Sequence, residues 1–271
     1  SYDGWIDANE TPTYSSVDTD TGVLTVASGA ASKFPMGCRV SFDQTQALSY
    51  YWTFNTNSTA DVGSATMSNV GTPTYTAGKF SNALTLNGTN QALSITDASG
   101  FKPTGEFTIG AWVKPTDAAN YNIIFQSQSK NTNIAGIKLY TVQTSGVLLL
   151  EIGNNTGTTI RANYSQLIGL TNICDNTYHH IVITFRNNYA QMYVDGKLET
   201  FDYCLTPAYA ATNYVRIGCD NASGTNINFF KGQIDDLFII NGYALDEETI
   251  RQRSEEHTSE LQSPMYLVCR L

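Results

Sequence analysis

Short β-type segments separated by turn signals fill the chain from Tyr50 to Ile240, and this pattern restricts the fold more than any other feature. The turn signals recur roughly every 8 to 12 residues, a spacing typical of antiparallel sandwiches and barrels. Strands do not alternate with helical segments, and the phosphate-binding motifs GxGxxG and GxxxxGK(S/T) are absent, so a parallel nucleotide-binding sheet is excluded. We therefore predict an all-β fold, an antiparallel two-sheet jelly-roll sandwich.

Two features of the sequence show individual strands and hairpins. Residues 107–113 place apolar side chains at every second position, as a strand with one buried face requires. Two tight turns are predicted at Asn187-Asn188 and Asp195-Gly196, because these residue types tolerate the left-handed backbone of short hairpin turns.

The charge composition excludes two classes of partner. Charged residues make up only 14% of the 271 residues, and the formal net charge is −9. Binding to nucleic acid or to an anionic membrane surface needs clustered cations, and no Lys/Arg cluster occurs. The longest apolar runs have the length of a strand, so we expect no membrane insertion. A surface rich in uncharged polar residues suits neutral polar ligands such as sugars.

Histidine and cysteine give no indication of a zinc site or of nucleophilic catalysis. His179 and His180 are adjacent, so on a strand they face opposite ways and do not chelate one ion together. The five cysteines contain no C-x-x-C pair and are predicted to be small buried thiols.

Four segments in order resemble the laminin-G-like, concanavalin A-like lectin/glucanase superfamily, in its pentraxin-related branch. They read "FTIGAWVKP", "YHHIVITFRNNYAQMYVDGKL", "VRIGCDN" and "FFKGQIDDLFIINGYALDEETI". The resemblance covers residues 47–252, with Tyr178 where the family usually has Trp. It implies a jelly-roll sandwich that acts as a lectin-like module for glycans on a cell surface.

The same superfamily contains glucanases, whose strand motif Glu-x-Asp-x-Glu is absent here. Retaining glycosidases need two carboxylates about 5 Å apart. Glu106, Glu151 and Glu199 are the glutamates between residues 47 and 244, and they are scattered along the sequence. We therefore predict that the chain is not an enzyme.

Candidate sugar-binding residues are the amides and the tyrosine of two polar loops. Asn120, Tyr121 and Asn122 belong to one loop, and Asn221 and Asn226 to the other. An aromatic ring covers the CH face of a sugar, while amides bond its hydroxyls. The alternative, solvated loop residues without a ligand, stays open.

The resemblance also implies one calcium ion near a loop edge. Asp235 shares parity with apolar positions farther along its predicted strand, so it is expected to face inward, where a cation or backbone N–H groups must satisfy the carboxylate. Asn87 and Asn90, in a neighbouring turn, are the other candidate metal ligands. The opposite strand phase, which would bury Asp236 instead, stays open.

Residues 1–46 and residues 253–271 resemble sequences from outside the sandwich family. Residues 1–46 resemble a small β-rich module found in bacteriophage tail and other virion proteins. A helix is predicted over residues 245–252, with Asp246 as its N-cap. Residues 253–271 contain "RSEEHTSELQS", which resembles a translated sequencing adapter, so we predict that this tail is not native.

The combined reading is a carbohydrate-binding module of a virion tail fibre or of a surface adhesin. It predicts a location on the virion surface or outside the cell, and homo-oligomerisation, with three chains if the module lies in a fibre. Two alternatives stay open: a structural assembly domain of a tail fibre, and an accessory domain of a glycan-degrading enzyme.

Overall fold

The computed structural model describes most of the sandwich and two strands near the N-terminus. Those two strands, β1 (Tyr14–Asp18) and β2 (Val23–Val26), pair antiparallel. The rest of the expected N-terminal module and residues 257–271 lie outside the described residues. The described residues of the sandwich are 48–63, 65–96, 101–127, 135–154, 164–209, 214–222 and 224–256.

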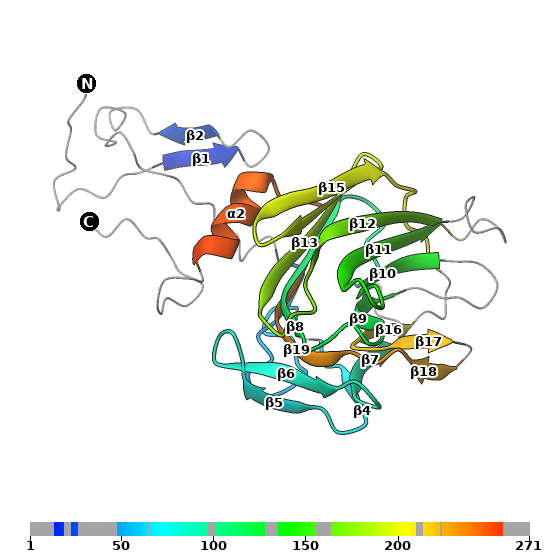
Figure 1. The fold of residues 1–271 in the computed structure, drawn as a ribbon. Helices are drawn as coiled ribbons and strands as arrows, with labels where there is room; N and C mark the ends of the chain where they lie inside the picture. Colours follow the sequence, from blue (N-terminus) through cyan, green and yellow to red (C-terminus); the bar gives the residue numbers. More distant parts are fainter. Residues whose placement is uncertain are drawn as a thin grey trace. The chain divides into compact units, whose positions relative to one another are not determined.

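Two antiparallel sheets form the sandwich and face each other (Figure 1). The first has seven strands in the order β12-β11-β10-β9-β16-β7-β4. Its strands are β4 (Ser68–Val70), β7 (Ala92–Thr96), β9 (Asn122–Gln126), β10 (Ala135–Thr141), β11 (Val147–Asn154), β12 (Tyr164–Asn172) and β16 (Tyr214–Ile217).

The second sheet has eight strands, in the order β15-β14-β13-β8-β19-β6-β5, with β3 also paired to β19. Its strands are β3 (Tyr50–Trp52), β5 (Thr74–Ala77), β6 (Asn82–Asn87), β8 (Phe107–Pro115), β13 (His179–Arg186), β14 (Tyr189–Val194), β15 (Lys197–Tyr203) and β19 (Lys231–Asn241). A short hairpin, β17 (Asp220–Ala222) and β18 (Thr225–Ile227), follows β16. The predicted all-β, two-sheet antiparallel fold is confirmed.

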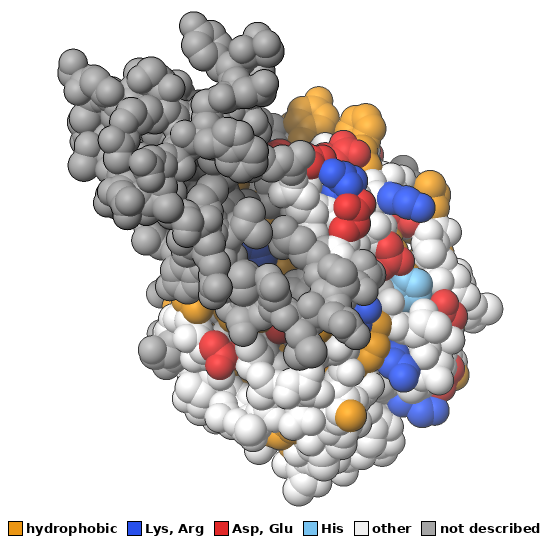
Figure 2. Space-filling model, turned by 90° about the vertical axis from the view of Figure 1, so that its left-hand side faces the viewer, with side chains coloured by type: hydrophobic (Ala, Val, Ile, Leu, Met, Phe, Trp, Pro, Cys, Tyr) orange, Lys and Arg blue, Asp and Glu red, His pale blue; other side chains and the backbone are white. Residues whose placement is uncertain are grey.

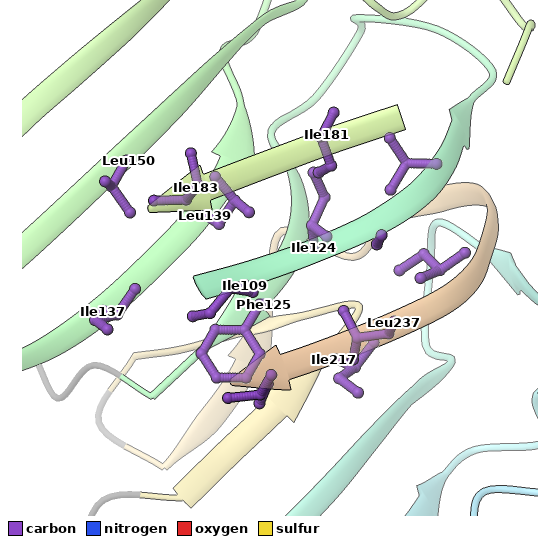
Figure 3. Packing of buried hydrophobic residues seen from close by; sticks show 14 of the residues in the cluster. Ile109, Ile124, Phe125, Ile137, Leu139, Leu150, Ile181, Ile183, Ile217 and Leu237 are labelled. Atoms are coloured by element: carbon purple, nitrogen blue, oxygen red, sulfur yellow. The ribbon is translucent and has the colours of Figure 1, made fainter. Parts of the chain in front are cut away.

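The core lies between the facing sheets and uses the alternation seen in the sequence. Every second side chain of β8 from Phe107 to Val113 is buried in it. Burial of one such side chain stabilises the fold by about 1.5–3 kcal/mol. Figure 3 shows the packed side chains, among them Ile109, Ile181 and Ile183 from the eight-stranded sheet and Ile124, Phe125, Ile137, Leu139 and Leu150 from the seven-stranded sheet.

Both predicted hairpin turns are present. Asn187 and Asn188 have φ of 51° and 62° between β13 and β14. Asp195 and Gly196 have φ of 51° and 76° between β14 and β15. These left-handed conformations explain why Asn, Asp and Gly occupy the turns.

Strand β19 contains a bulge at its two adjacent acids. The register with β8 shifts between Asp235 and Phe238, and Asp236 has φ of 46°. An extra residue reverses the parity of a strand, so Ile234 and Leu237 both reach the main core although they lie three positions apart. The sequence offered two phases for this strand, and the structure uses one on each side of the bulge.

Helix α2 (Glu247–Glu256) covers part of the outer face of the eight-stranded sheet. The Oδ1 atom of Asp246 accepts the Thr249 N–H at 2.7 Å, so the predicted N-cap is confirmed. Leu245 and Ile250 pack with buried residues of β13, β14 and β19. The helix continues past residue 252, so its last turn falls in the segment predicted to be a non-native tail. No helix among the described residues is long and apolar enough to cross a membrane.

Replacement of Gly110 tests how tightly β8 packs. A Cβ at this position would lie 2.4 Å from the Phe238 ring. We expect Gly110→Ala to lower the free energy of unfolding by about 1–3 kcal/mol, because an overpacked site must displace its neighbours. Gly105→Ala is the matched control, since no atom lies within 4 Å of its added Cβ. Urea unfolding of both variants measures the difference, and equal stability would contradict the packing described here.

Candidate functional site

Six polar positions form one line across the outer face of the seven-stranded sheet. Each is in register with the next, on strands β7, β16, β9, β10, β11 and β12. They lie on the face opposite the core, because their sequence neighbours on these strands are core residues. We call this line the polar row; it consists of Ser94, Arg216, Gln126, Lys138, Glu151 and Gln166.

A buried ionic network occupies the middle of the polar row. The Lys138 ammonium lies 3.3 Å from Glu151 Oε2 and 3.4 Å from Oδ2 of Asp220, the first residue of β17. Gln126 Nε2 donates to the other Asp220 oxygen at 2.6 Å. Lys138, Glu151 and Asp220 are 3%, 7% and 1% exposed, so these charges persist only because each is paired and hydrogen-bonded.

Tyrosines border the polar row. The Tyr140 hydroxyl donates to Glu151 Oε1 at 3.1 Å, and its ring centroid lies 4.4 Å from the Lys138 ammonium. Tyr121 packs edge-on against Tyr140, with ring centroids 5.8 Å apart, and is 38% exposed. At the other end, the guanidinium of Arg216 lies 4.8 Å from the ring of exposed Tyr214.

Arg216 provides a donor to the polar row. Its side chain is 8% exposed, and burial lowers the pKa of the guanidinium. The Nε–H has no hydrogen-bond partner among the described residues. A buried donor of this kind gains a hydrogen bond when a ligand supplies an acceptor.

Of the first predicted sugar-binding loop, one residue lies beside the polar row. Tyr121 reaches its border. Asn120 is exposed, and its carbonyl accepts from Asn122 Nδ2 at 3.4 Å. Asn122 is buried; its Nδ2 donates to Thr141 Oγ1 and its Oδ1 accepts the Lys231 N–H. Asn122 therefore serves the fold, because both ends of its amide are already bonded within the protein.

The second predicted loop is the β17-β18 hairpin. Asn221 Nδ2 donates to Asn226 Oδ1 at 3.1 Å across the hairpin, and Asn221 Oδ1 accepts the Gly224 N–H. Both asparagines are partly exposed. The structure thus brings this predicted pair together, next to Asp220 of the ionic network.

The three scattered glutamates have separate places. Glu106 pairs with Arg186 at 3.1 Å, and Glu199 accepts the Leu170 N–H at 2.6 Å, which ties β15 to β12. Glu151 alone joins the polar row. The sequence gives only a weak indication that Glu151 has a special role, since it is one charged residue within the apolar run of β11. The register between β10 and β11 is needed to bring Glu151 next to Lys138.

The predicted calcium ligands do not form one site. Asn87 and Asn90 lie together in an exposed turn, where Asn87 Oδ1 accepts the Thr89 and Asn90 N–H groups. Asn87 is in register with Lys231, so Asp235 is four residues farther along β19, roughly 13 Å away. The grouping of Asp235 with these two asparagines is therefore wrong. Calcium at another place stays a prediction.

Backbone donors satisfy Asp235 in place of a cation. Its Oδ2 accepts the N–H groups of Lys79 and Phe80 at 2.9 and 3.0 Å, and its Oδ1 accepts that of Asp236. Burial raises the pKa of Asp235 to about 7. Within the described part of the chain, no three His, Cys, Asp or Glu side chains are placed to hold a metal ion.

The two adjacent histidines face opposite ways, as predicted. His179 Nδ1 lies 2.8 Å from Asp195 Oδ2, and this contact raises the pKa of His179. His180 is buried and packs beside Trp112, with ring centroids 5.1 Å apart.

Asp236→Asn tests the electrostatics of the bulge. Burial raises the pKa of Asp236 from 3.8 to about 6, and Tyr51 donates to its Oδ1 at 2.6 Å. A raised folded-state pKa contributes stability that is complete below about pH 4 and is lost as pH rises through 6. Asparagine keeps an acceptor and does not ionise. We therefore expect the variant to gain on the order of 2 kcal/mol relative to the parent at pH 7, and nothing near pH 4.

Urea unfolding of parent and variant at both pH values measures this difference. A difference that stays constant between pH 4 and pH 7 would show that the carboxyl does not titrate as described.

The family model described as the concanavalin A-like lectin/glucanases superfamily matches residues 87–251. No curated protein matches the chain. The chain is similar to the binding domain of Paraclostridial mosquitocidal protein 1, with 15% identity and a TM-score of 0.62, and to the binding domain of botulinum neurotoxin serotype D, with 15% identity and a TM-score of 0.59.

For each of these two toxin domains the match covers 78% of this chain and 52% of the other, so the chain spans about half the length of these relatives. A third similar structure is domain 4 of AbnA, a GH43 extracellular arabinanase from Geobacillus stearothermophilus, in complex with arabinotriose. It has 19% identity and a TM-score of 0.60, and the match covers 77% of this chain and 98% of that domain.

Proposed function

Because the chain belongs to the concanavalin A-like lectin/glucanases superfamily, we propose that it is a carbohydrate-binding module that holds a saccharide against the outer face of its seven-stranded sheet. The observation that carries this proposal is the polar row, a line of amide, hydroxyl and charged side chains bordered by tyrosines. Saccharide sites combine such hydrogen-bonding groups with flat rings that cover CH surfaces.

The ionic network favours a rigid site. Lys138, Glu151 and Asp220 fix one another, so the neighbouring amides do not have to be ordered when a ligand arrives. A preorganised site loses less entropy on binding. The exposed groups at its border, Gln166, Ile168 and Tyr121, are the proposed points of first contact with the saccharide.

The same network favours binding over hydrolysis. A retaining glycosidase needs one carboxylic acid that donates a proton and one carboxylate that attacks the sugar. Here a single ammonium lies within 3.4 Å of both Glu151 and Asp220, and both carboxylates are buried in ion pairs within the protein. Carboxylates that hold the site together in this way support a binding protein.

Two biological settings fit the proposal. The arabinanase domain was solved with arabinotriose bound, and the match covers nearly all of it, which favours an accessory domain of a glycan-degrading enzyme as the second candidate. A virion tail fibre or surface adhesin that binds cell-surface glycans, trimeric if it lies in a fibre, rests on the resemblance of residues 1–46. Either setting places the module outside the cell or on a virion.

Tyr121→Ala and Gln166→Ala test the site. Both side chains lie at the exposed border of the polar row, so their removal is expected to weaken saccharide binding about tenfold while the fold is retained. A glycan array that includes arabinan oligosaccharides identifies the ligand, and calorimetry then measures its affinity.

Tyr203→Ala is the matched control, because Tyr203 is an exposed tyrosine on β15 of the other sheet. Equal losses in all three variants would contradict the proposed site, and an array without any bound glycan would favour a structural domain. Repetition with EDTA tests the predicted calcium ion.

A further inference from the structure

A groove of about 350 Å³ opens on the other sheet, at one end of β6, β8 and β19. It belongs to the eight-stranded sheet, so it is distinct from the polar row, which lies on the seven-stranded sheet. The residues that line it include two lysines, two threonines and three amide side chains. Among them are Lys114, Thr116, Asn176, Lys231 and Gln233.

The cations of the groove are held in place but only partly neutralised. Lys231 Nζ lies 2.8 Å from Asp117, and this contact lowers the pKa of Asp117. Lys114 forms no ion pair with a described residue; its ammonium lies 5.7 Å from the centre of the Tyr178 ring. Lys79 makes the same kind of contact, since its ammonium lies 4.4 Å from the centre of the Trp112 ring. Trp112 lies two positions before Lys114 on β8.

This concentration of lysines stands out in a chain with a net charge of −9. Figure 2 shows Lys and Arg side chains on the described surface around the histidine, with Asp and Glu side chains among them. Cations within a hollow attract anionic ligands more strongly than isolated surface cations do, because the low-dielectric walls concentrate their field.

The floor of the groove is rigid. Gly232 has φ of 140°, and a Cβ there would lie 2.0 Å from the Lys114 carbonyl oxygen. Thr116 Oγ1 donates to the Lys231 carbonyl at 3.2 Å, and Tyr178 donates to Gln233 Oε1 at 2.9 Å. These contacts fix the two lysine backbones, so a ligand meets a preformed surface.

We propose that this groove binds the anionic group of an acidic saccharide, a uronate carboxylate or a sulfate ester. Lys114 and Lys231 donate charge-assisted hydrogen bonds to the anion. The amide of Asn176, which also lines the groove, bonds a hydroxyl of the same sugar. The module then has two binding faces, one on each sheet, and the acidic saccharide is recognised independently of the ligand of the polar row.

Calorimetry on the full chain tests the proposal with four probes: an oligogalacturonate, a heparin-derived sulfated oligosaccharide, an uncharged oligosaccharide of the same length, and sodium sulfate. We expect at least one of the two acidic oligosaccharides to bind, with an affinity that falls as salt is raised. Lys114→Ala/Lys231→Ala is expected to weaken that binding by about tenfold or more. Lys114→Gln/Lys231→Gln repeats the test with side chains of similar length, should the alanine variant unfold.

Two controls separate this groove from the polar row. Lys197→Ala removes an exposed lysine on β15 and is expected to leave binding of the acidic saccharide unchanged. Tyr121→Ala should also leave it unchanged, although it weakens binding at the polar row. The proposal is overturned if neither acidic oligosaccharide binds, if the double variants bind as well as the parent, or if sulfate alone or the uncharged oligosaccharide binds as tightly.

Discussion

The apolar contact between the two sheets is the constraint on which the other features depend. Alternate side chains of β8, β13 and β19 pack against those of β9, β10 and β11, and a slip of one residue in any of these strands would turn its apolar side chains to the outside. Because the core fixes the register, it also fixes which polar side chains face outward beside one another. The polar row is a direct result of that register.

Burial gives the two outer faces different character. On the seven-stranded sheet, Lys138 is almost fully enclosed and must bond with Glu151 and Asp220, since a lone charge there would cost several kcal/mol. On the eight-stranded sheet, Lys114 and Lys231 lie in an open groove and keep donors for a ligand. Burial therefore gives the charges around Lys138 a structural role, while Lys114 and Lys231 remain available to a ligand.

Sequence patterns predicted those strands, turns and caps that depend only on neighbouring residues. The alternation from Phe107 to Val113 gave a strand, Asn187-Asn188 gave a turn, and Asp246 gave a helix cap, because each depends on a few neighbouring residues. These patterns failed at β19, where a bulge reverses the parity between Ile234 and Leu237. They also failed for Asn122, whose amide bonds to residues distant in the sequence.

The sequence by itself determined the class of fold and several of its strands and turns, since periodicity and turn residues are properties of short segments. Four motifs carried the resemblance to the family. Only the tertiary structure decided the site. Lys138, Glu151 and Asp220 are separated by many residues, and one ammonium meets both carboxylates only after β10 pairs with β11 and the fold brings Asp220 of β17 close to Lys138. Pairing between distant strands depends on how the whole core packs, and no short stretch of sequence records that.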